Sequence, residues 1–313
     1  MANMSDNRAL IFDIKRDCSE DGPGIRTTVF FKGCPLSCDW CQNPEGKDKK
    51  PGLMFKADAC HPEQCQAACM TVCPEPVFTL NTGRLQVDHQ ACSRCERCFK
   101  VCPSNALQPV GYWIALDELL YRLMIDKPFY ASSSGGVTLS GGEATQQMGF
   151  VHRLLKALKA EGIHTALETS GFFNYRRFVE LVLPYLDLIY FDLKLINDNA
   201  SRRYTGQSSL PILENFVRLV KAAQIPVIPR VPLIPNITTR QENLQGIARF
   251  LEANGVPMAT LLPYNPLWVD KVEKLGKPIN YQRTAFMTPQ QQEACVQAFN
   301  LNQNEPRSVG YAD

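Results

Sequence analysis

Short apolar runs alternate with longer amphipathic segments through most of the chain. Runs rich in β-branched and aromatic residues predict strands, and segments with apolar residues every three to four positions predict helices. The expected strands are 26–33, 136–142, 164–171, 188–195, 225–234 and 259–265. The expected helices are 115–126, 146–161, 175–183, 213–223, 239–253 and 289–300, and in the second of them Phe150, Leu154, Leu155 and Leu158 share one face.

This alternation is typical of parallel strands joined by right-handed crossovers. The sequence therefore predicts an α/β fold, either a barrel or a doubly wound sheet. In both architectures ligands bind where the parallel strands end. Polar and glycine residues follow the expected strands at that point: Cys34, Gly141, Gly142, Glu143, Glu168, Thr169, Asp192 and Lys194. We therefore expect one functional site at the C-terminal edge of the sheet.

The composition excludes several classes of protein. With 313 residues, 45% of them hydrophobic, the chain can bury a sizeable core. Its formal net charge of +2 gives no footprint for nucleic acid or an anionic membrane. The first residues lack the pattern of a secretory signal, and charged residues interrupt the most apolar stretch, Phe178–Leu195. We expect a cytoplasmic protein.

Thirteen cysteines are unusual in such a chain, and eleven of them lie between Cys34 and Cys102. In a cytoplasmic protein of this length, cysteine clusters favour metal or redox sites over disulfides. Residues 55–108 carry eight of them and interrupt the strand–helix alternation, so we expect a small insert between two parts of the core, 1–54 and 109–313. So small a domain would depend on metal clusters for its stability.

The insert has the spacing of a two-cluster ferredoxin. Its second half reads C-x2-C-x2-C-x3-C-P, the run in which the fourth cysteine ligates the other cluster, and its less regular first half keeps the final x3-C-P. Exchange of the fourth cysteines predicts two ligand sets: Cys60, Cys65, Cys69 and Cys102, and Cys73, Cys92, Cys95 and Cys98. Zinc, which prefers separated cysteine pairs, and His61 as a substitute ligand are the alternatives.

Three further cysteines, Cys34, Cys38 and Cys41, follow the first expected strand in the segment CPLSCDWC. The insert uses its own eight cysteines, so only Cys18 is near enough in sequence to supply a fourth ligand. Catalytic metal sites keep one position open, whereas structural sites close it. Three thiolates on a [4Fe–4S] cluster would leave one iron free, and we expect that iron to be a binding site.

The C-x3-C-x2-C loop, with Trp40 before its last cysteine, resembles the signature of radical S-adenosylmethionine (SAM) enzymes. Longer motifs resemble one group of them, the glycyl radical enzyme activating enzymes, and the insert resembles the longer branch of that group. These motifs, in chain order, are DGPGIRTTVFFKGC (21–34), WCQNPE (40–45), DKPFY (126–130), SGGVTLSGGE (134–143), FDLK (191–194), RVPLIP (230–235) and LLPY (261–264).

This resemblance implies a partial (β/α)6 barrel of the TIM type, with a SAM-binding [4Fe–4S] cluster at its rim and two more clusters in a ferredoxin-like insert. It implies reductive cleavage of SAM to methionine and a 5′-deoxyadenosyl radical, which abstracts a Cα hydrogen from a glycine of a partner glycyl radical enzyme. A flavodoxin or ferredoxin would donate the electron, in an anaerobic setting. The cofactor carries this chemistry, and the protein supplies position and electrostatics.

The resemblance also assigns residues. SAM contacts are expected from Trp40, Cys41, Gln42, Gly141, Gly142, Glu143, Glu168, Thr169, Asp192, Leu193, Lys194 and Arg230. Glu143 would accept from the SAM ammonium group, and Glu168 and Asp192, with Thr169, would hold a monovalent cation or form hydrogen bonds alone. Asn265 stands where relatives often have histidine. The partner's glycine segment would face Asp21, Gly22, Pro23, Gly24 and Arg26, although D-G-P-G is also strong turn chemistry.

Two expectations concern the end of the chain. Cys295 is a small buried side chain of an amphipathic helix, and residues 307–313 form a terminal strand. Two other functions compete with the activating enzyme: a radical SAM enzyme that modifies a small molecule or peptide with auxiliary clusters, and an electron carrier or zinc-rich interaction module. Because the insert directly follows the first cysteine motif, the activating enzyme is the favoured interpretation.

Overall fold

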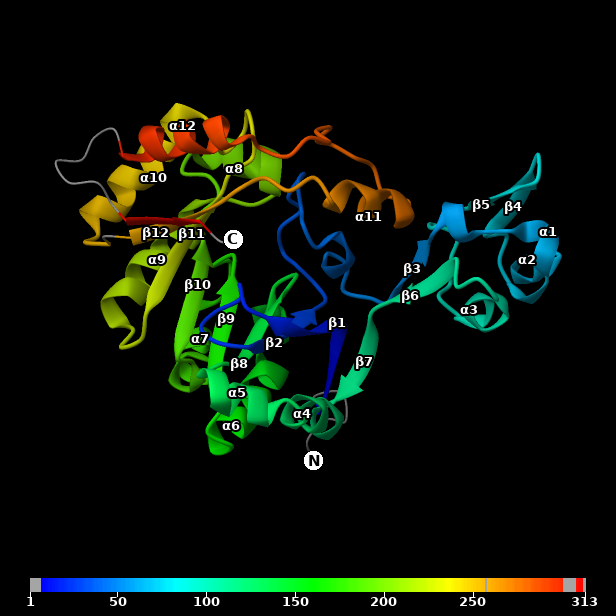
Figure 1. Ribbon diagram of the computed structural model, residues 1–313, viewed down its shortest axis with the longest axis horizontal. Coiled ribbons are helices and arrows are strands. Elements are labelled where there is room, and N and C mark those ends of the chain that lie inside the picture. The colour runs from blue at the N-terminus through cyan, green and yellow to red at the C-terminus, as the bar shows by residue number, and fades with distance from the viewer. Residues whose placement is uncertain (1–6, 257, 301–307, 312–313) are drawn as a thin grey trace.

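The fold is described from a computed structural model, which covers residues 7–256, 258–300 and 308–311. Its centre is a nine-stranded sheet with the order β13-β12-β11-β10-β9-β8-β2-β1-β7 (Figure 1). The strands of this sheet are β1 (Arg8–Cys18), β2 (Arg26–Phe31), β7 (Tyr112–Ala115), β8 (Gly136–Gly141), β9 (His164–Thr169), β10 (Leu188–Asp192), β11 (Val227–Pro232), β12 (Met258–Leu262) and β13 (Ser308–Tyr311).

From β2 to β13 all neighbouring strands are parallel. Strands β2 and β8 to β12 are the six that the sequence predicts, and residues 308–311 add the expected terminal strand beside β12. Within the described residues the sheet ends at β13 on one side and at β7 on the other, so it is open. The partial (β/α)6 barrel is confirmed.

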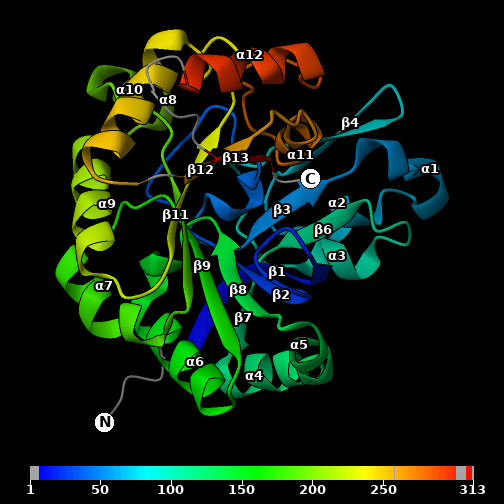
Figure 2. The ribbon, with the colours of Figure 1, turned by 60° about the vertical axis from the view of Figure 1, so that its left-hand side comes forward.

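Helices connect the parallel strands and mostly cover the outside of the curved sheet (Figure 2). They are α4 (Leu116–Met124), α5 (Lys127–Ser133), α6 (Met148–Ala160), α7 (Tyr175–Leu181), α8 (Asp198–Thr205), α9 (Leu210–Ala222), α10 (Gln241–Ala253), α11 (Trp268–Lys274) and α12 (Pro289–Asn300). Helix α11 instead packs against the turn Pro44–Gly46 that follows the C-x3-C-x2-C loop. Of the helices in the described residues, none has the length and apolar character needed to cross a bilayer.

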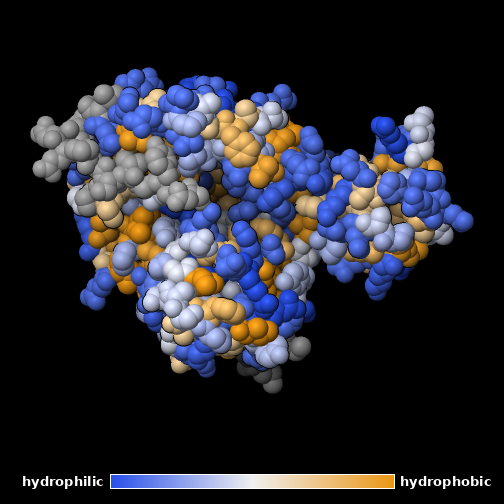
Figure 3. Space-filling view, in the orientation of Figure 1, coloured by the Kyte–Doolittle hydropathy of each residue, from blue (hydrophilic) through white to orange (hydrophobic). Residues whose placement is uncertain are grey.

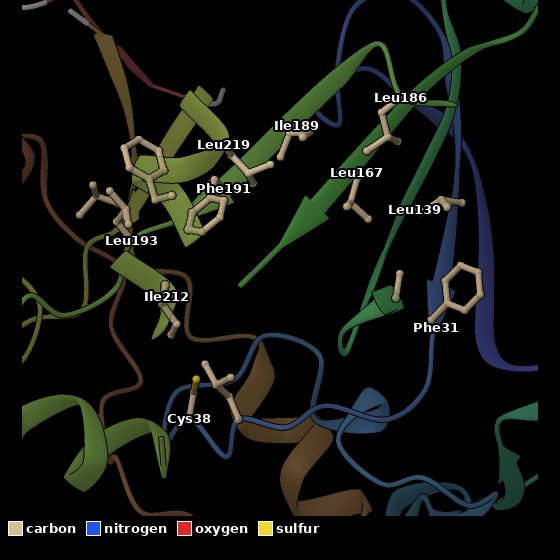
Figure 4. Packing of buried hydrophobic residues seen from close by; sticks show 14 of the residues in the cluster. Phe31, Cys38, Leu139, Leu167, Leu186, Ile189, Phe191, Leu193, Ile212 and Leu219 are labelled. Atoms are coloured by element: carbon tan, nitrogen blue, oxygen red, sulfur yellow. The ribbon is translucent and has the colours of Figure 1, made fainter. Parts of the chain in front are cut away.

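Successive residues of a strand point to opposite faces, which gives this sheet an apolar outer face and a polar inner face. Phe31, Leu139, Leu167, Ile189 and Phe191 are fully buried and belong to one core cluster (Figure 4). The predicted apolar face of α6 belongs to the same cluster, and each of its four residues is at most 4% exposed: Phe150, Leu154, Leu155 and Leu158. The inner face is therefore free to carry polar chemistry.

A cysteine-rich lobe projects from the barrel (Figure 1). Its two ends pair as an antiparallel ribbon of β3 (Gly52–Phe55) and β6 (Leu107–Val110). Beyond this ribbon lie three short helices and a hairpin: α1 (Pro62–Cys65), α2 (Ala68–Val72), β4 (Phe78–Asn81), β5 (Arg84–Val87) and α3 (Arg97–Val101). The lobe has a small core of its own, to which Cys69 and Cys98 contribute beside Leu53, Val77 and Phe78.

Candidate functional site

Cys34, Cys38 and Cys41 lie on a loop that leaves the C-terminal end of β2. Main-chain hydrogen bonds hold this loop on two sides: the N–H of Cys34 donates to the carbonyl of Lys47 (3.1 Å), and the N–H of Ser37 donates to the carbonyl of Thr205 at the end of α8 (2.8 Å). A loop fixed through its backbone keeps its three thiols in one arrangement.

Burial governs the chemistry of these thiols. It raises the pKa of Cys34 above its ordinary value and that of Cys38 to about 11, although Lys194 and Lys47 act on Cys38 in the opposite direction. A buried thiol with a raised pKa stays protonated near neutral pH unless a cation stabilises its thiolate. Iron supplies that positive charge, so the donor set fits a cluster bound by thiolates.

Cys18 does not complete this site. It pairs in register with Arg26 at the start of β2, whereas Cys34 follows the end of that strand, about 20 Å away at the usual rise of a strand. The thiol of Cys18 is buried and donates to the carbonyl of Lys15 (3.5 Å). Cys295 is buried in α12, as expected. Neither cysteine is a fourth ligand of the loop.

The insert gathers its eight cysteines around two pockets. One pocket is lined by Cys60, Cys65, Cys69 and Cys102, and the other by Cys73, Cys92, Cys95 and Cys98. These are the two sets that the exchange of fourth cysteines predicts. His61 lies beside the first pocket with its side chain about half exposed, 3.8 Å from the carboxylate of Glu63.

The choice between zinc and iron–sulfur clusters rests on ligand spacing. Zinc prefers separated cysteine pairs, whereas the C-x2-C-x2-C-x3-C-P run of the insert is typical of ferredoxins with [4Fe–4S] clusters.

The Gly-Gly-Glu turn after β8 packs directly against the cysteine loop. The N–H of Gly142 donates to Phe31 (2.8 Å), and that of Glu143 donates to Gly33 (2.9 Å). A Cβ atom at Gly142 would lie 2.4 Å from the carbonyl oxygen of Gly46, and Gly141 has a φ of +108°. Because other residues would clash or be strained here, both glycines are required for this close approach.

The carboxylate of Glu143 points into the protein. It is 1% exposed and accepts from the hydroxyl of Thr145 (2.8 Å), the hydroxyl of Thr169 (2.9 Å) and both the N–H and hydroxyl of Ser170 (2.8 and 2.6 Å). Hydrogen bonds of this kind fix the ends of β8 and β9 to each other. This geometry suits a residue that positions the turn, and its direct contact with a SAM ammonium group stays a prediction.

A charged network links the ends of three neighbouring strands. Arg230 on β11 donates to Glu168 on β9 and to Asp192 on β10, the latter at 3.0 Å. Lys194 donates to the other oxygen of Asp192 (3.0 Å). Ser140 on β8 donates to the second oxygen of Glu168. The side chains of Arg230 and Glu168 are 12% and 15% exposed, so this network is largely shielded from water.

Arg230 lies between the two carboxylates of this network. Glu168 and Asp192 are on adjacent strands, and the guanidinium group between them supplies positive charge; a monovalent cation at these carboxylates stays a prediction. Burial alone would raise the pKa of Asp192, and the opposing charges of Arg230 and Lys194 outweigh it and lower that pKa. Arg230 is thus the centre of the network.

Three other expected SAM contacts lie beside the cysteine loop. Trp40 and Leu193 are 3% and 1% exposed, so they shape the site through packing. The amide of Gln42 donates to the carbonyl of Asn265 (2.9 Å). Asn265 therefore contributes its main chain here, whereas its side chain accepts from the N–H of Leu267 (2.9 Å).

The D-G-P-G loop lies at the opposite end of β2 from the cysteines. Asp21, Gly22 and Gly24 are half-buried, and Pro23 is exposed. Arg26 is completely buried and donates to the hydroxyl of Thr138 (2.7 Å) and to the carbonyl of Pro23 (3.1 Å). Arg26 therefore supports the loop from inside, and its contact with a partner stays a prediction.

The inner face of the sheet connects the D-G-P-G loop with the charged network. Thr138, Ser140 and Tyr190 lie on it, and the guanidinium of Arg230 is 5.0 Å from the ring centre of Tyr190. None of these three residues was an expected site residue. The two-residue alternation along β8 and β10 was the signal that could have identified them.

Comparison with protein families gives two matches. The model of the radical SAM superfamily matches residues 92–251, and that of a 4Fe-4S single cluster domain matches residues 20–72. Among solved structures, a radical SAM methyltransferase from Sphaerobacter thermophilus aligns over 96% of this chain and 77% of its own, with a TM-score of 0.53 at 13% identity. That similarity concerns the fold alone.

Characterised relatives are similar over most of their length. The chain is 35% identical to the isethionate sulfite-lyase activating enzyme of Nitratidesulfovibrio vulgaris, over 88% of this chain and 91% of the relative. It is 36% identical to the choline trimethylamine-lyase activating enzyme of Oleidesulfovibrio alaskensis (95% and 98%) and 37% identical to the (2S)-3-sulfopropanediol dehydratase activating enzyme of Klebsiella oxytoca (86% and 86%). The chain belongs to the glycyl radical enzyme activating enzymes of the radical SAM superfamily.

Proposed function

We propose that Cys34, Cys38 and Cys41 hold a [4Fe–4S] cluster with one open iron, and that SAM binds there to activate a cognate glycyl radical enzyme. The cluster and SAM, when bound, supply a one-electron reductive cleavage that yields methionine and a 5′-deoxyadenosyl radical, which takes the Cα hydrogen of a partner glycine. The observation that carries this proposal is the convergence of the cysteine loop, the Gly-Gly-Glu turn and the charged network at the ends of the parallel strands.

The residues at the C-terminal ends of the parallel strands, which form the rim of the barrel, have separate roles. Gly141 and Gly142 let the turn pack closely against the cysteine loop, and Lys194 and Arg230 are placed to receive a carboxylate such as that of SAM. Glu143, through Thr169 and Ser170, keeps the turn in place. Trp40 and Leu193 exclude water from the loop, which strengthens these electrostatic contacts. These assignments rest on the geometry and on the family motif together.

The glycine segment of the partner would lie along the polar inner face, between the D-G-P-G loop and the rim. Relatives with 35 to 37% identity are named for partners that act on isethionate, choline and a sulfopropanediol. Such similar chains serve partners of different substrate chemistry, so we infer that the barrel recognises the partner's glycine segment and not the small molecule that the partner converts.

Activation in trans tests the proposal directly. The protein, loaded with iron and sulfide and reduced under anaerobic conditions, is mixed with SAM and with a glycyl radical enzyme of the same organism. We expect methionine and 5′-deoxyadenosine to form and a glycine-centred radical to appear in the electron paramagnetic resonance spectrum. SAM cleavage without that radical on the partner would favour the alternative, a radical SAM enzyme acting on another substrate.

We further infer that the two cysteine sets of the insert hold electron-carrying [4Fe–4S] clusters. The pocket of Cys73, Cys92, Cys95 and Cys98 borders Pro51, Gly52 and Leu53, which connect the insert with the cysteine loop. The pocket of Cys60, Cys65, Cys69 and Cys102 lies against α1, in the outer part of the lobe (Figure 1). The set of Cys73, Cys92, Cys95 and Cys98 is therefore the one nearer to the cysteine loop. The set of Cys60, Cys65, Cys69 and Cys102 is farther from that loop, and there a flavodoxin or ferredoxin would donate its electron.

Substitutions in the two sets should separate electron delivery from SAM binding. In Cys95→Ala and in Cys65→Ala we expect SAM affinity to stay within about twofold of the wild type, because neither residue is near the rim. Cleavage driven by reduced flavodoxin should fall at least tenfold, and cleavage driven by dithionite, which reaches the rim directly, should persist. Isothermal titration calorimetry measures the SAM affinity, and product assays measure the rate of SAM cleavage. A loss of SAM binding in either variant would contradict the inference and make the insert part of the SAM site.

A further inference from the structure

Three large apolar side chains are unusually exposed on one part of the barrel wall. Tyr121 is 71% exposed, Phe129 56% and Ile125 50%. They follow one another at intervals of four residues: Tyr121 lies on α4, Ile125 at the C-terminal cap of α4 and Phe129 on α5, so they lie on the exposed side of this pair of helices. Figure 3 shows hydrophobic residues gathered over α4 and α5. We call these three residues the α4–α5 stripe.

The fold does not need this stripe. The opposite side of the same segment is already buried in the core, where Leu119 and Leu123 are 0% and Tyr130 is 3% exposed. Exposed apolar side chains scattered singly are common on proteins, but a contiguous group with polar surroundings marks a surface that binds another molecule. Tyr and Phe are residue types enriched at protein–protein interfaces. The stripe therefore has the chemistry of a docking surface.

The stripe is continuous with the D-G-P-G loop. The hydroxyl of Ser133, at the end of α5, accepts from the N–H of Ile25 (2.8 Å) and donates to the carbonyl of Phe129 (2.8 Å). A Cβ atom at Gly24 would lie only 2.4 Å from the carbonyl oxygen of Ser133, so the loop packs closely against the helix end. One hydroxyl group thus links the turn that carries Phe129 to the loop.

A second anchor fixes the other end of α5. Asp126, between the two helices, is 8% exposed and accepts from the hydroxyl of Thr27 (2.8 Å) and from the guanidinium of Arg16 (3.0 Å). Both partners belong to the strands that flank the D-G-P-G loop. The loop and the stripe are consequently held as one rigid surface, and a molecule that contacts the loop would meet the stripe next to it.

We propose that the α4–α5 stripe is a docking surface for the partner glycyl radical enzyme, which it holds while the partner's glycine segment passes the D-G-P-G loop. This inference rests on the proposed function. The occupant is a folded protein because the loop alone offers few residues, whereas a specific complex needs a much larger buried area with aromatic anchors near its centre. Polar pairs border the stripe, among them Glu118 with Arg122 and Lys127 with Glu161.

The test measures binding and catalysis separately. A glycyl radical enzyme of the same organism is immobilised, and binding of the cluster-loaded wild type, Phe129→Ser and the double variant Tyr121→Ser/Phe129→Ser is followed anaerobically by interferometry. We expect Kd for the partner to rise at least tenfold in the double variant. The single variant Phe129→Leu, which keeps an apolar side chain, should have a Kd close to that of the wild type. SAM cleavage without partner should be unchanged. Phe286→Ser, at a side chain that is 57% exposed away from the stripe, is the matched control and should bind normally.

Each outcome is decisive for the stripe. Unchanged partner affinity in the double variant, or equal loss in Phe286→Ser, overturns the proposal. A wild type that sediments as a dimer, with a monomeric double variant of normal partner affinity, would assign the stripe to contacts between copies of this chain and overturns it too. If the wild type fails to cleave SAM while partner binding still depends on Phe129, the proposed function fails and the docking surface stands.

Discussion

Replacement of Cys38 by alanine should abolish SAM cleavage and the glycine-centred signal on the partner, with a loss of at least a thousandfold. Cys38 is 7% exposed and lies on the loop whose backbone is fixed by Lys47 and α8. With two thiolates left, a [4Fe–4S] cluster loses one of the few bonds that hold it. Iron analysis after reconstitution should therefore show about four irons fewer per chain than in the wild type.

Cys18→Ala is the matched control for this experiment. Cys18 is as well buried as Cys38, at 4% exposed, but lies at the other end of β2. It should keep its iron content, its SAM affinity and its radical formation, at a modest cost in stability. A Cys18→Ala protein without the SAM-binding cluster would mean that this thiol occupies the fourth position, and cleavage retained in Cys38→Ala would refute the assignment of the loop.

Replacement of Arg230 by methionine should cause the largest loss of stability among the rim residues. The substitution leaves Glu168 without its guanidinium partner and Asp192 paired with Lys194 alone, and breaking a buried ion pair in this way costs about 3 kcal/mol of unfolding free energy. The effect is measured as a lower midpoint of urea unfolding for the cluster-loaded protein, and SAM affinity should fall at least tenfold. Arg122→Met, which breaks an exposed pair with Glu118, should cost less than about 1 kcal/mol.

The pH dependence checks the cause of this loss. Arg230 and Lys194 lower the pKa of Asp192, so the stability that Asp192 contributes is fully present above the unfolded pKa and is lost as the pH falls through the folded one. The stability difference between wild type and Arg230→Met should therefore shrink below about pH 4. A difference that stays constant down to pH 3 would show that Arg230 acts through packing and not through charge.

The parallel strands of the barrel were predictable because each is a short run rich in β-branched or other apolar residues whose outward side chains are buried in the core. Strand β1 was not recognised, since its alternating residues include Asp13, Lys15 and Arg16 and its burial depends on pairing with β2 and β7. Helix α8 was missed for a related reason: it is strongly polar and is defined by local capping, in which Asn197 accepts from the N–H of Ala200.

The residues of the candidate site were predictable from the sequence, but the side chains that they contact were not. The cysteine spacings gave the two sets of the insert, because ligand spacing is a property of the local chain. Arg26 and Arg230 could not be placed in the same way. Whether a guanidinium faces solvent, a ligand or a carboxylate depends on the register of neighbouring strands, and here register puts Arg230 opposite Asp192 and Arg26 opposite Gly136.

The ribbon of β3 and β6 has a consequence for how such enzymes are built. Gly52 and Val110 face each other across it, so their Cα atoms are about 5 Å apart, as in any antiparallel pair. A tight turn could close that gap after excision of everything in between, and the surrounding architecture would keep every strand and every thiol of its rim. An electron-transfer domain can thus be added to, or removed from, an enzyme whose catalytic barrel is already complete.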